Sequence, residues 1–190
     1  MYPTRTRRSG FTLIELITVM AVMAAMMAIV APKLRVTAKT KARIAARQLM
    51  IDLEQVRNRS LSQKKKVRIA FNTVANSYTA YADHNSDGVI TESATERSAL
   101  NAFGVRTLES GIVFGRGNAT AGIPSEAGVG AVTYAGAAAD FDTRGIPTPV
   151  GTTGTVYVTT TSDPSAVYAV SMTAAGSYRF WSFNPNGSWQ

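Results

Sequence analysis

The most distinct pattern along the chain is an apolar run near its start. Residues 11–31 hold only three polar side chains, Thr12, Glu15 and Thr18. At about 1.5 Å per residue, a helix over this run is about 30 Å long, which matches the hydrocarbon core of a bilayer. The pattern predicts a transmembrane helix over 11–31. Glu15 needs an explanation, because a charged group at the bilayer centre costs at least ~2.5 kcal/mol on insertion scales.

A second helical pattern follows between residues 38 and 63, a stretch without glycine or proline. Its apolar residues recur at spacings of three and four, which places them on one helix face. They are Ala42, Ala45, Ala46, Leu49, Leu53 and Val56. We expect the helix to continue past Pro32, to pack its apolar stripe on a sheet and to end near Ser62 and Gln63.

Beyond Lys66 the pattern changes to short alternating segments typical of strands. The predicted strands are 67–71, 77–82, 112–114, 155–161, 166–173 and 177–183. Residues 162–165 are predicted as the turn of a hairpin, and Asn186-Gly187 as a tight turn before Trp189. Residues 115–139, rich in Gly and Ala, are predicted as a long loop. A helix followed by antiparallel strands indicates the α+β class.

Charge divides the chain into regions. The net charge of +8 is carried by residues 33–68, where twelve Lys and Arg face two acids, whereas residues 69–190 hold five Arg and nine acids. The predicted organisation is a leader (1–10), a transmembrane helix (11–31), a basic amphipathic helical stalk (32–66) and a β-rich globular domain (67–190). Because the chain has no cysteine, no disulfide stabilises this domain.

The leader and the start of the apolar run resemble a known signal. Three arginines precede Gly10, and residues 10–16 read Gly-Phe-Thr-Leu-Ile-Glu-Leu. This segment resembles the prepilin signal of type IV pilins and type II secretion pseudopilins. The resemblance implies cleavage by prepilin peptidase between Gly10 and Phe11, methylation of the new Phe11 amine, and a helix kink at Pro32. It also implies anchoring in the bacterial inner membrane, with the C-terminal domain outside the cytoplasm.

Cleavage at this junction would explain the carboxylate. It creates a positive amine at Phe11, and Glu15 of one subunit can then pair with the Phe11 amine of a neighbour. In a medium of low dielectric such a pair is strong and an unpaired carboxylate is costly. The alternative is a protonated Glu15 near the membrane interface. The expected partners are therefore other pilin or pseudopilin subunits.

The distal half resembles the FimT/GspH group of minor pilins and pseudopilins in three places: residues 81–88, 141–145 and 176–181. Within the first, Asp83, Asn85 and Asp87 precede Gly88 with the spacing of an EF-hand loop, which makes them candidate calcium ligands. The twelfth position is Ala94, so Glu92 or Glu96 would have to supply the later acid. The alternative is a turn whose polar side chains satisfy one another.

Some FimT proteins bind DNA through arginines of the last strand, and here only Arg179 matches that pattern. Lys64, Lys65 and Lys66 are further candidate phosphate contacts. Trp181 and Trp189 offer stacking surfaces beside Arg179, or they alternate between core and solvent. Two further partners would suit the positive charge of the stalk, namely anionic lipid headgroups and the acidic faces of neighbouring subunits.

Nothing in the sequence indicates an enzyme. His84 is the one histidine, and no nucleophile elbow, zinc ligand set or phosphate-binding glycine loop accompanies it. Apart from the calcium candidate, no cofactor is expected. The leading hypothesis is a minor pilin or pseudopilin that primes assembly near the tip of a type IV pilus or a type II secretion pseudopilus. One alternative is a DNA-binding competence pilin. Another is an uncleaved single-pass anchor with a cytoplasmic stalk, which the excess of cations after the span favours.

Overall fold

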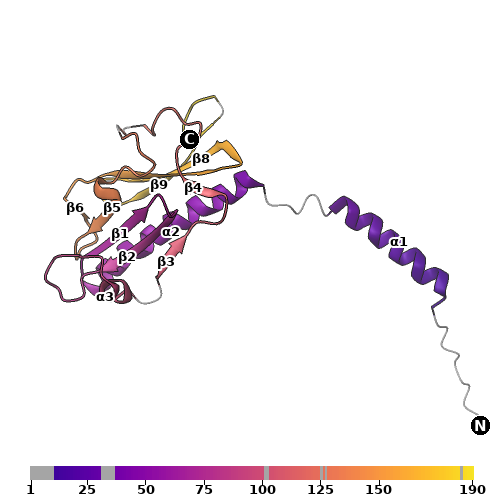
Figure 1. The fold of residues 1–190 in the computed structure, drawn as a ribbon, viewed down its shortest axis with the longest axis horizontal. Coiled ribbons are helices and arrows are strands. Elements are labelled where there is room, and N and C mark those ends of the chain that lie inside the picture. The colour runs from indigo at the N-terminus through magenta and orange to yellow at the C-terminus, as the bar shows by residue number, and fades with distance from the viewer. Residues whose placement is uncertain (1–10, 31–36, 101–102, 125, 127, 185) are drawn as a thin grey trace, which may run out of the picture. The chain divides into compact units, whose positions relative to one another are not determined.

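The computed structural model describes residues 11–30, 37–100, 103–124, 126, 128–184 and 186–190 (Figure 1). The chain divides into two compact units, Met1–Val36 and Thr37–Gln190. The predicted leader, Gly10 and the predicted kink at Pro32 lie outside the described residues. The predictions made for them therefore stay predictions.

The described part of the first unit is the helix α1, Leu13–Val30. Thr12 begins it: its carbonyl accepts from the Leu16 amide at 3.2 Å, and its hydroxyl accepts from the Glu15 amide at 3.3 Å. Among the described residues, no helix combines the length and the apolar character needed to cross a membrane. The predicted span extends to Ala31, which is not described.

The second unit begins with α2, Ala38–Gln63, which ends where the sequence pattern predicts. Thr37 caps its first turn by accepting from the Thr40 amide at 3.3 Å, and Lys64 ends it in a left-handed conformation. The stripe of apolar residues is confirmed: Ala42, Ala46, Leu49, Leu53 and Val56 are fully buried. Asp52 and Ser60 are buried on the same helix.

Two antiparallel sheets form the rest of the unit. The first has the order β3-β2-β1-β5-β6, with β1 Val67–Asn72, β2 Ser77–Ala82, β3 Val105–Thr107, β5 Ala138–Phe141 and β6 Pro147–Thr148. The second has the order β4-β7-β8-β9, with β4 Ile112–Phe114, β7 Gly154–Thr160, β8 Asp163–Met172 and β9 Tyr178–Ser182. A short helix, α3 Ala94–Ser98, and a 3-10 turn, η2 Ala135–Ala137, lie in the connections. The fold class is α+β, as predicted.

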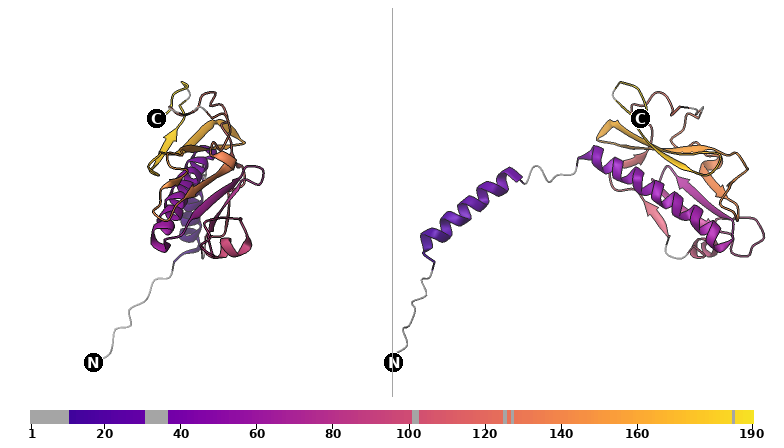
Figure 2. Two further views of the ribbon diagram at one scale, coloured as in Figure 1. Left: turned by 90° about the vertical axis from the view of Figure 1, so that its left-hand side faces the viewer. Right: turned by 180° about the vertical axis from the view of Figure 1, so that it is seen from behind.

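The main core lies where α2 packs against both sheets. The helix contacts β1 of the first sheet and β7, β8 and β9 of the second, as Figure 2 shows from two sides. Beside it, four aromatic rings pack together, with Phe71 stacked on Tyr134 at 5.8 Å and in contact with Tyr78 and Phe114. Burying this apolar surface is the main stabilising term for a domain without disulfides.

A smaller cluster lies on the face of the second sheet that is turned away from α2. It is built on Tyr157, Val167 and Ala169, with Ala119 and Ile123 from the long connection above them. The C-terminal turn closes it, because Trp189 forms an isolated bridge with Phe183 and packs edge-on against Tyr157 at 5.6 Å. The turn predicted at Asn186-Gly187 is therefore confirmed.

Two details of the predicted strands need correction. The hairpin turn predicted at 162–165 is shorter, because β8 begins at Asp163, which pairs with Thr160. The loop predicted over 115–139 ends earlier, at η2, and its last residues join β5. Ala138 pairs with Ala70 and Ala139 with Ile69 of β1, and Ala139 is buried. The sequence reasoning also missed α3, β3 and β6.

Candidate functional site

The first candidate site is α1 itself, because its surface is apolar on every side. Its described large apolar side chains range from 50% exposed at Val19 to 78% at Leu13, and Phe11 just before the helix is 79% exposed. A helix that is apolar all round is normally buried in a protein core or in a membrane. Within the described part of the first unit, no other element covers this surface.

Glu15 differs from the other two polar residues at the start of α1. Thr12 uses its hydroxyl to cap the helix, and the Thr18 hydroxyl donates to the Glu15 carbonyl at 2.9 Å. Both hydroxyls are thus satisfied within the helix. Among the described residues, the Glu15 carboxylate has no hydrogen-bond or ion-pair partner. The described part of the first unit therefore has one exposed carboxylate without a partner near the start of the helix.

The second candidate, the loop after β2, uses three of the four carboxylate oxygens of Asp83 and Asp87 in hydrogen bonds within the loop. Asp83 is buried and its Oδ2 accepts from the Gly88 amide at 2.8 Å. Asp87 accepts from the Val89 amide and from the Asn85 side chain, both at 2.8 Å. These contacts are those of a turn, but Asp83 Oδ1 is buried and has no hydrogen-bond partner among the described residues.

The later acids proposed for calcium point to other partners. Glu96 caps α3 by accepting from Ser93 and Thr91, and Glu92 pairs with Arg68 at 3.2 Å. Burial alone would raise the pKa of Glu96, but the bonds from Ser93 and Thr91 outweigh it, so the pKa is lowered. Within the described ranges, no three His, Cys, Asp or Glu side chains gather as metal ligands. Calcium binding by Asp83, Asn85 and Asp87 stays a prediction.

The lysines proposed as DNA contacts also have internal roles. Lys65 donates to the His84 carbonyl at 2.8 Å, and Lys66 donates to the Gly88 carbonyl at 2.9 Å. Both side chains are half-buried and hold the loop after β2, whereas Lys64 is exposed at the end of α2. None of the three lines the cavity in which Arg179 lies. The structure therefore does not gather these four cations into one surface.

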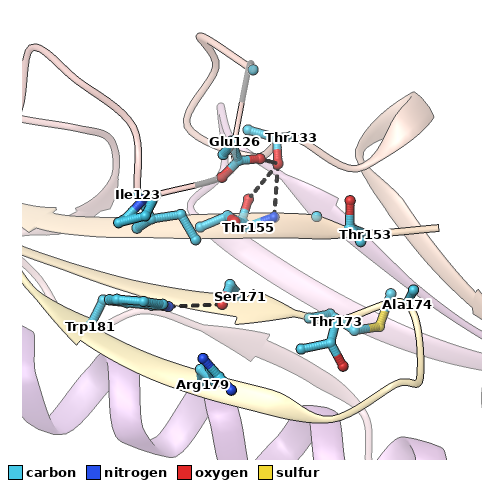
Figure 3. A pocket seen from close by; sticks show the side chains of 14 residues that line it. Ile123, Glu126, Thr133, Thr153, Thr155, Ser171, Thr173, Ala174, Arg179 and Trp181 are labelled. Atoms are coloured by element: carbon cyan, nitrogen blue, oxygen red, sulfur yellow. Dashed lines mark hydrogen bonds between the residues drawn. The ribbon is translucent and has the colours of Figure 1, made fainter. Parts of the chain in front are cut away.

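Arg179 lies at a cavity of about 650 Å³ on the outer face of β7, β8 and β9 (Figure 3). It is exposed and has no hydrogen-bond or ion-pair partner in the described part of the chain. Trp181 shares the cavity, with its indole nitrogen donating to the Ser171 hydroxyl at 2.8 Å. Trp189 does not line it, because its ring packs on Tyr157 and Phe183.

The opposite wall of this cavity carries Glu126, which sequence reasoning missed. Its carboxylate accepts from the Tyr157 hydroxyl at 3.1 Å. It also accepts from the Thr133 hydroxyl, which in turn accepts from the Thr155 amide at 2.8 Å (Figure 3). The signal in the sequence was faint, namely the one acid within residues 115–139. Arg116 shapes this wall, because its guanidinium lies 4.2 Å from the Tyr157 ring centre and donates to the Gly130 carbonyl.

Comparison with known proteins bears first on the N-terminal segment. Residues 5–31 match the family described as the prokaryotic N-terminal methylation motif. The chain therefore carries a prepilin-type signal, as the sequence analysis predicted, and an α+β domain follows it. No match was found among curated protein sequences.

Solved structures of pilin-like proteins are similar to this chain over most of their length. Two structures of the minor pseudopilin EpsH from the type II secretion system of Vibrio cholerae match at 12% and 14% identity. They cover 75% and 76% of this chain and 97% and 95% of EpsH, with TM-scores of 0.48 and 0.49. The type IV minor pilin FimU of Pseudomonas aeruginosa matches at 13% identity, covering 78% of this chain and 91% of FimU, with a TM-score of 0.47.

Proposed function

We propose that this protein is a minor pilin or pseudopilin, a subunit of a type IV pilus or a type II secretion pseudopilus. The observation that carries the proposal is the methylation motif over residues 5–31, joined to a helix whose apolar surface is exposed all round. Prepilin peptidase then cleaves between Gly10 and Phe11, and the Phe11 amine is methylated. The apolar run of residues 11–31 first holds the chain in the inner membrane, with residues 37–190 outside the cytoplasm.

Assembly then uses the carboxylate that the helix leaves unpartnered. Glu15 of one subunit pairs with the Phe11 amine of a neighbour as the helices stack. Two unit charges 4 Å apart attract by about 4 kcal/mol at an effective dielectric constant of 20. The pair offsets the cost of moving each charge out of water, and it sets the register between neighbouring helices.

Placement near the filament tip and a role in priming assembly belong to the same proposal. The resemblance of residues 81–88, 141–145 and 176–181 to the FimT/GspH group supports a minor over a major subunit. The contacts within the domain support a scaffold rather than an enzyme, since Asp83, Asp87 and Glu96 all serve local turns and caps.

The proposal is tested by mass spectrometry of the chain expressed with an active prepilin peptidase. We expect a mature N-terminus at Phe11 carrying one methyl group. Glu15→Gln keeps the shape of the side chain and removes its charge, so cleavage should persist while incorporation into sheared filaments is lost. Thr18→Val, one helical turn away, is the matched control and should be incorporated normally. An uncleaved chain, or normal incorporation of Glu15→Gln, would contradict the proposal.

A further inference from the structure

We propose that a basic pocket beside the first turns of α2 binds the phosphate of an anionic phospholipid headgroup. The basic pocket is a hollow of about 210 Å³ between α2 and the β8–β9 edge of the second sheet, lined by Lys39, Arg43, Tyr168, Phe180 and Asn184 among others. It is separate from the cavity at Arg179 and from the loop after β2.

The two cations of the pocket are free to bind a ligand. Lys39 and Arg43 are four residues apart, so they project from the same side of α2. Both are exposed, and within the described residues neither has a hydrogen-bond or ion-pair partner. Lys41, which lies between them in the sequence, is different because it pairs with Glu109.

The charges around the pocket leave it positive. One turn further along α2, the Arg47 guanidinium lies 5.2 Å from the centre of the Phe180 ring and adds a third cation. Among the described residues, the acid whose charge acts on Tyr168 in the pocket is Asp163, and Arg43 acts on Tyr168 in the opposite sense. Asp163 already accepts hydrogen bonds from the Ser165 amide and hydroxyl at 3.2 and 2.5 Å. Three cations against one engaged carboxylate favour an anionic ligand.

The lining suits a lipid headgroup better than a free anion. Phe180 and Phe183 give the pocket a half-buried aromatic wall beside its cations. Such a combination of aromatic and basic side chains is typical of the membrane interface, where a ligand presents a phosphate next to a glycerol and acyl chain. A fully hydrated inorganic phosphate would gain from the cations but not from that wall.

Position along the chain supports the same ligand. α2 begins eight residues after α1 ends, and Lys39 follows Val30 by nine. Nine residues reach at most about 32 Å even when fully extended. If the proposed function holds and residues 11–31 lie in the inner membrane, the pocket is tethered within reach of the headgroups. There a negative surface potential attracts Lys and Arg and falls off within a Debye length.

The test measures binding of a soluble short-chain phosphatidylglycerol to the full chain in neutral detergent micelles, by native mass spectrometry and by chemical-shift changes at Lys39 and Arg43. We expect saturable binding that short-chain phosphatidylcholine does not reproduce. Lys39→Glu with Arg43→Glu should weaken it about tenfold or more, since each cation near an anionic surface contributes several-fold in affinity. The control is Lys64→Glu, at the other end of α2 and about 37 Å from Lys39 along the helix axis. It should change the affinity for the lipid less than twofold.

The other outcomes overturn the proposal. Equal binding of phosphatidylcholine excludes recognition of the anion, and equal shifts from inorganic phosphate reduce the pocket to a general anion site. Stronger competition by a short single-stranded DNA assigns it to nucleic acid. If Lys64→Glu weakens lipid binding as much as the double variant does, the lipid responds to the overall charge of the chain and not to the pocket. The short-chain lipid is soluble, so it can reach the pocket whether or not α1 enters the micelle. If size exclusion shows that α1 stays outside the micelle, that result counts against the proposed function and not against the pocket.

Discussion

Replacing Tyr78 by Phe tests how α2 is fastened to the first sheet. The Tyr78 hydroxyl donates to Asp52 Oδ2 at 2.6 Å, and Asp52 is 2% exposed. Burial, and after it the bond to Asp52, raises the pKa of Tyr78 well above its ordinary value, so the hydroxyl stays protonated and donates. The carboxylate also accepts from Gln48 Nε2 at 2.9 Å, while Arg106 Nε is 4.0 Å away.

The expected loss in the free energy of unfolding follows from the contacts that Tyr78→Phe keeps and the one that it removes. Phe fills the same space and keeps the contacts with Phe71, Phe103 and Phe114, so the apolar term is unchanged. What is lost is one hydrogen bond to a buried charge, worth about 1.5–3 kcal/mol. Arg106 at 4.0 Å makes no close bond that could replace it.

The assay is urea unfolding of residues 37–190, which form a compact unit with their own core. Tyr78→Phe should lower the free energy of unfolding by about 1.5–3 kcal/mol without changing its dependence on urea. Tyr81→Phe on the same strand is the control, because the Tyr81 hydroxyl has no hydrogen-bond partner among the described residues. Its free energy of unfolding should stay within about 0.5 kcal/mol of that of the parent. A loss below about 0.5 kcal/mol for Tyr78→Phe, or equal losses for both variants, would refute the reasoning.

Three further predictions concern the two clusters of the domain. Leu53→Ala, at a fully buried position of α2, should lower the free energy of unfolding by about 2–5 kcal/mol in urea denaturation. Gly154→Ala should cost about 1–3 kcal/mol and broaden the aromatic NMR signals of Tyr134, because the new Cβ would lie 2.3 Å from that ring. Burial raises the pKa of Tyr157 to about 12, although the Ile123 amide bonded to its hydroxyl opposes the rise. Above pH 10 the unfolded chain loses this proton while the folded chain keeps it, so Tyr157 should lower stability between pH 10 and 12 by up to about 1.4 kcal/mol per pH unit. Tyr157→Phe should make the fall in stability shallower by that amount, and the remainder includes the contributions of Tyr78, Tyr134 and Tyr178, whose pKa is also raised by burial.

How much of the fold the sequence predicts depends on whether a segment carries its own pattern. The buried stripe of α2 and the alternation in β1 are local, and both were predicted correctly. β3 has three exposed residues, and β6 has two residues that begin with Pro147, so neither has an alternation to detect. β5 forms a strand through its pairing with β1. That tertiary contact cannot be predicted from the local sequence, because alanine has a low preference for strands.

The candidate sites divide in the same way. Glu15 could be identified from the sequence because a carboxylate within a long apolar run is unfavourable whatever fold the rest of the chain adopts. The contact of Glu126 with Thr133 and Tyr157 was not, because it depends on how a glycine-rich connection crosses the outer face of the second sheet. Lys65 and Lys66 were predicted as available cations, and only the fold shows that the carbonyls of His84 and Gly88 engage them.

These contacts show which cations of the basic segment, residues 33–68, are available to a partner. Toward its C-terminal end most cations other than the exposed Lys64 are used internally. Arg57 donates to the Gly145 carbonyl at 2.8 Å, and Arg68 binds both oxygens of Asp140 at 2.7 and 2.8 Å. Toward its N-terminal end Lys39 and Arg43 remain unengaged among the described residues. A nucleic acid lying along the segment would need cations along its whole length, with each neutralised phosphate adding to the salt dependence of binding. Free positive charge gathered at the end of α2 that adjoins the apolar helix in sequence instead favours a partner at the membrane surface.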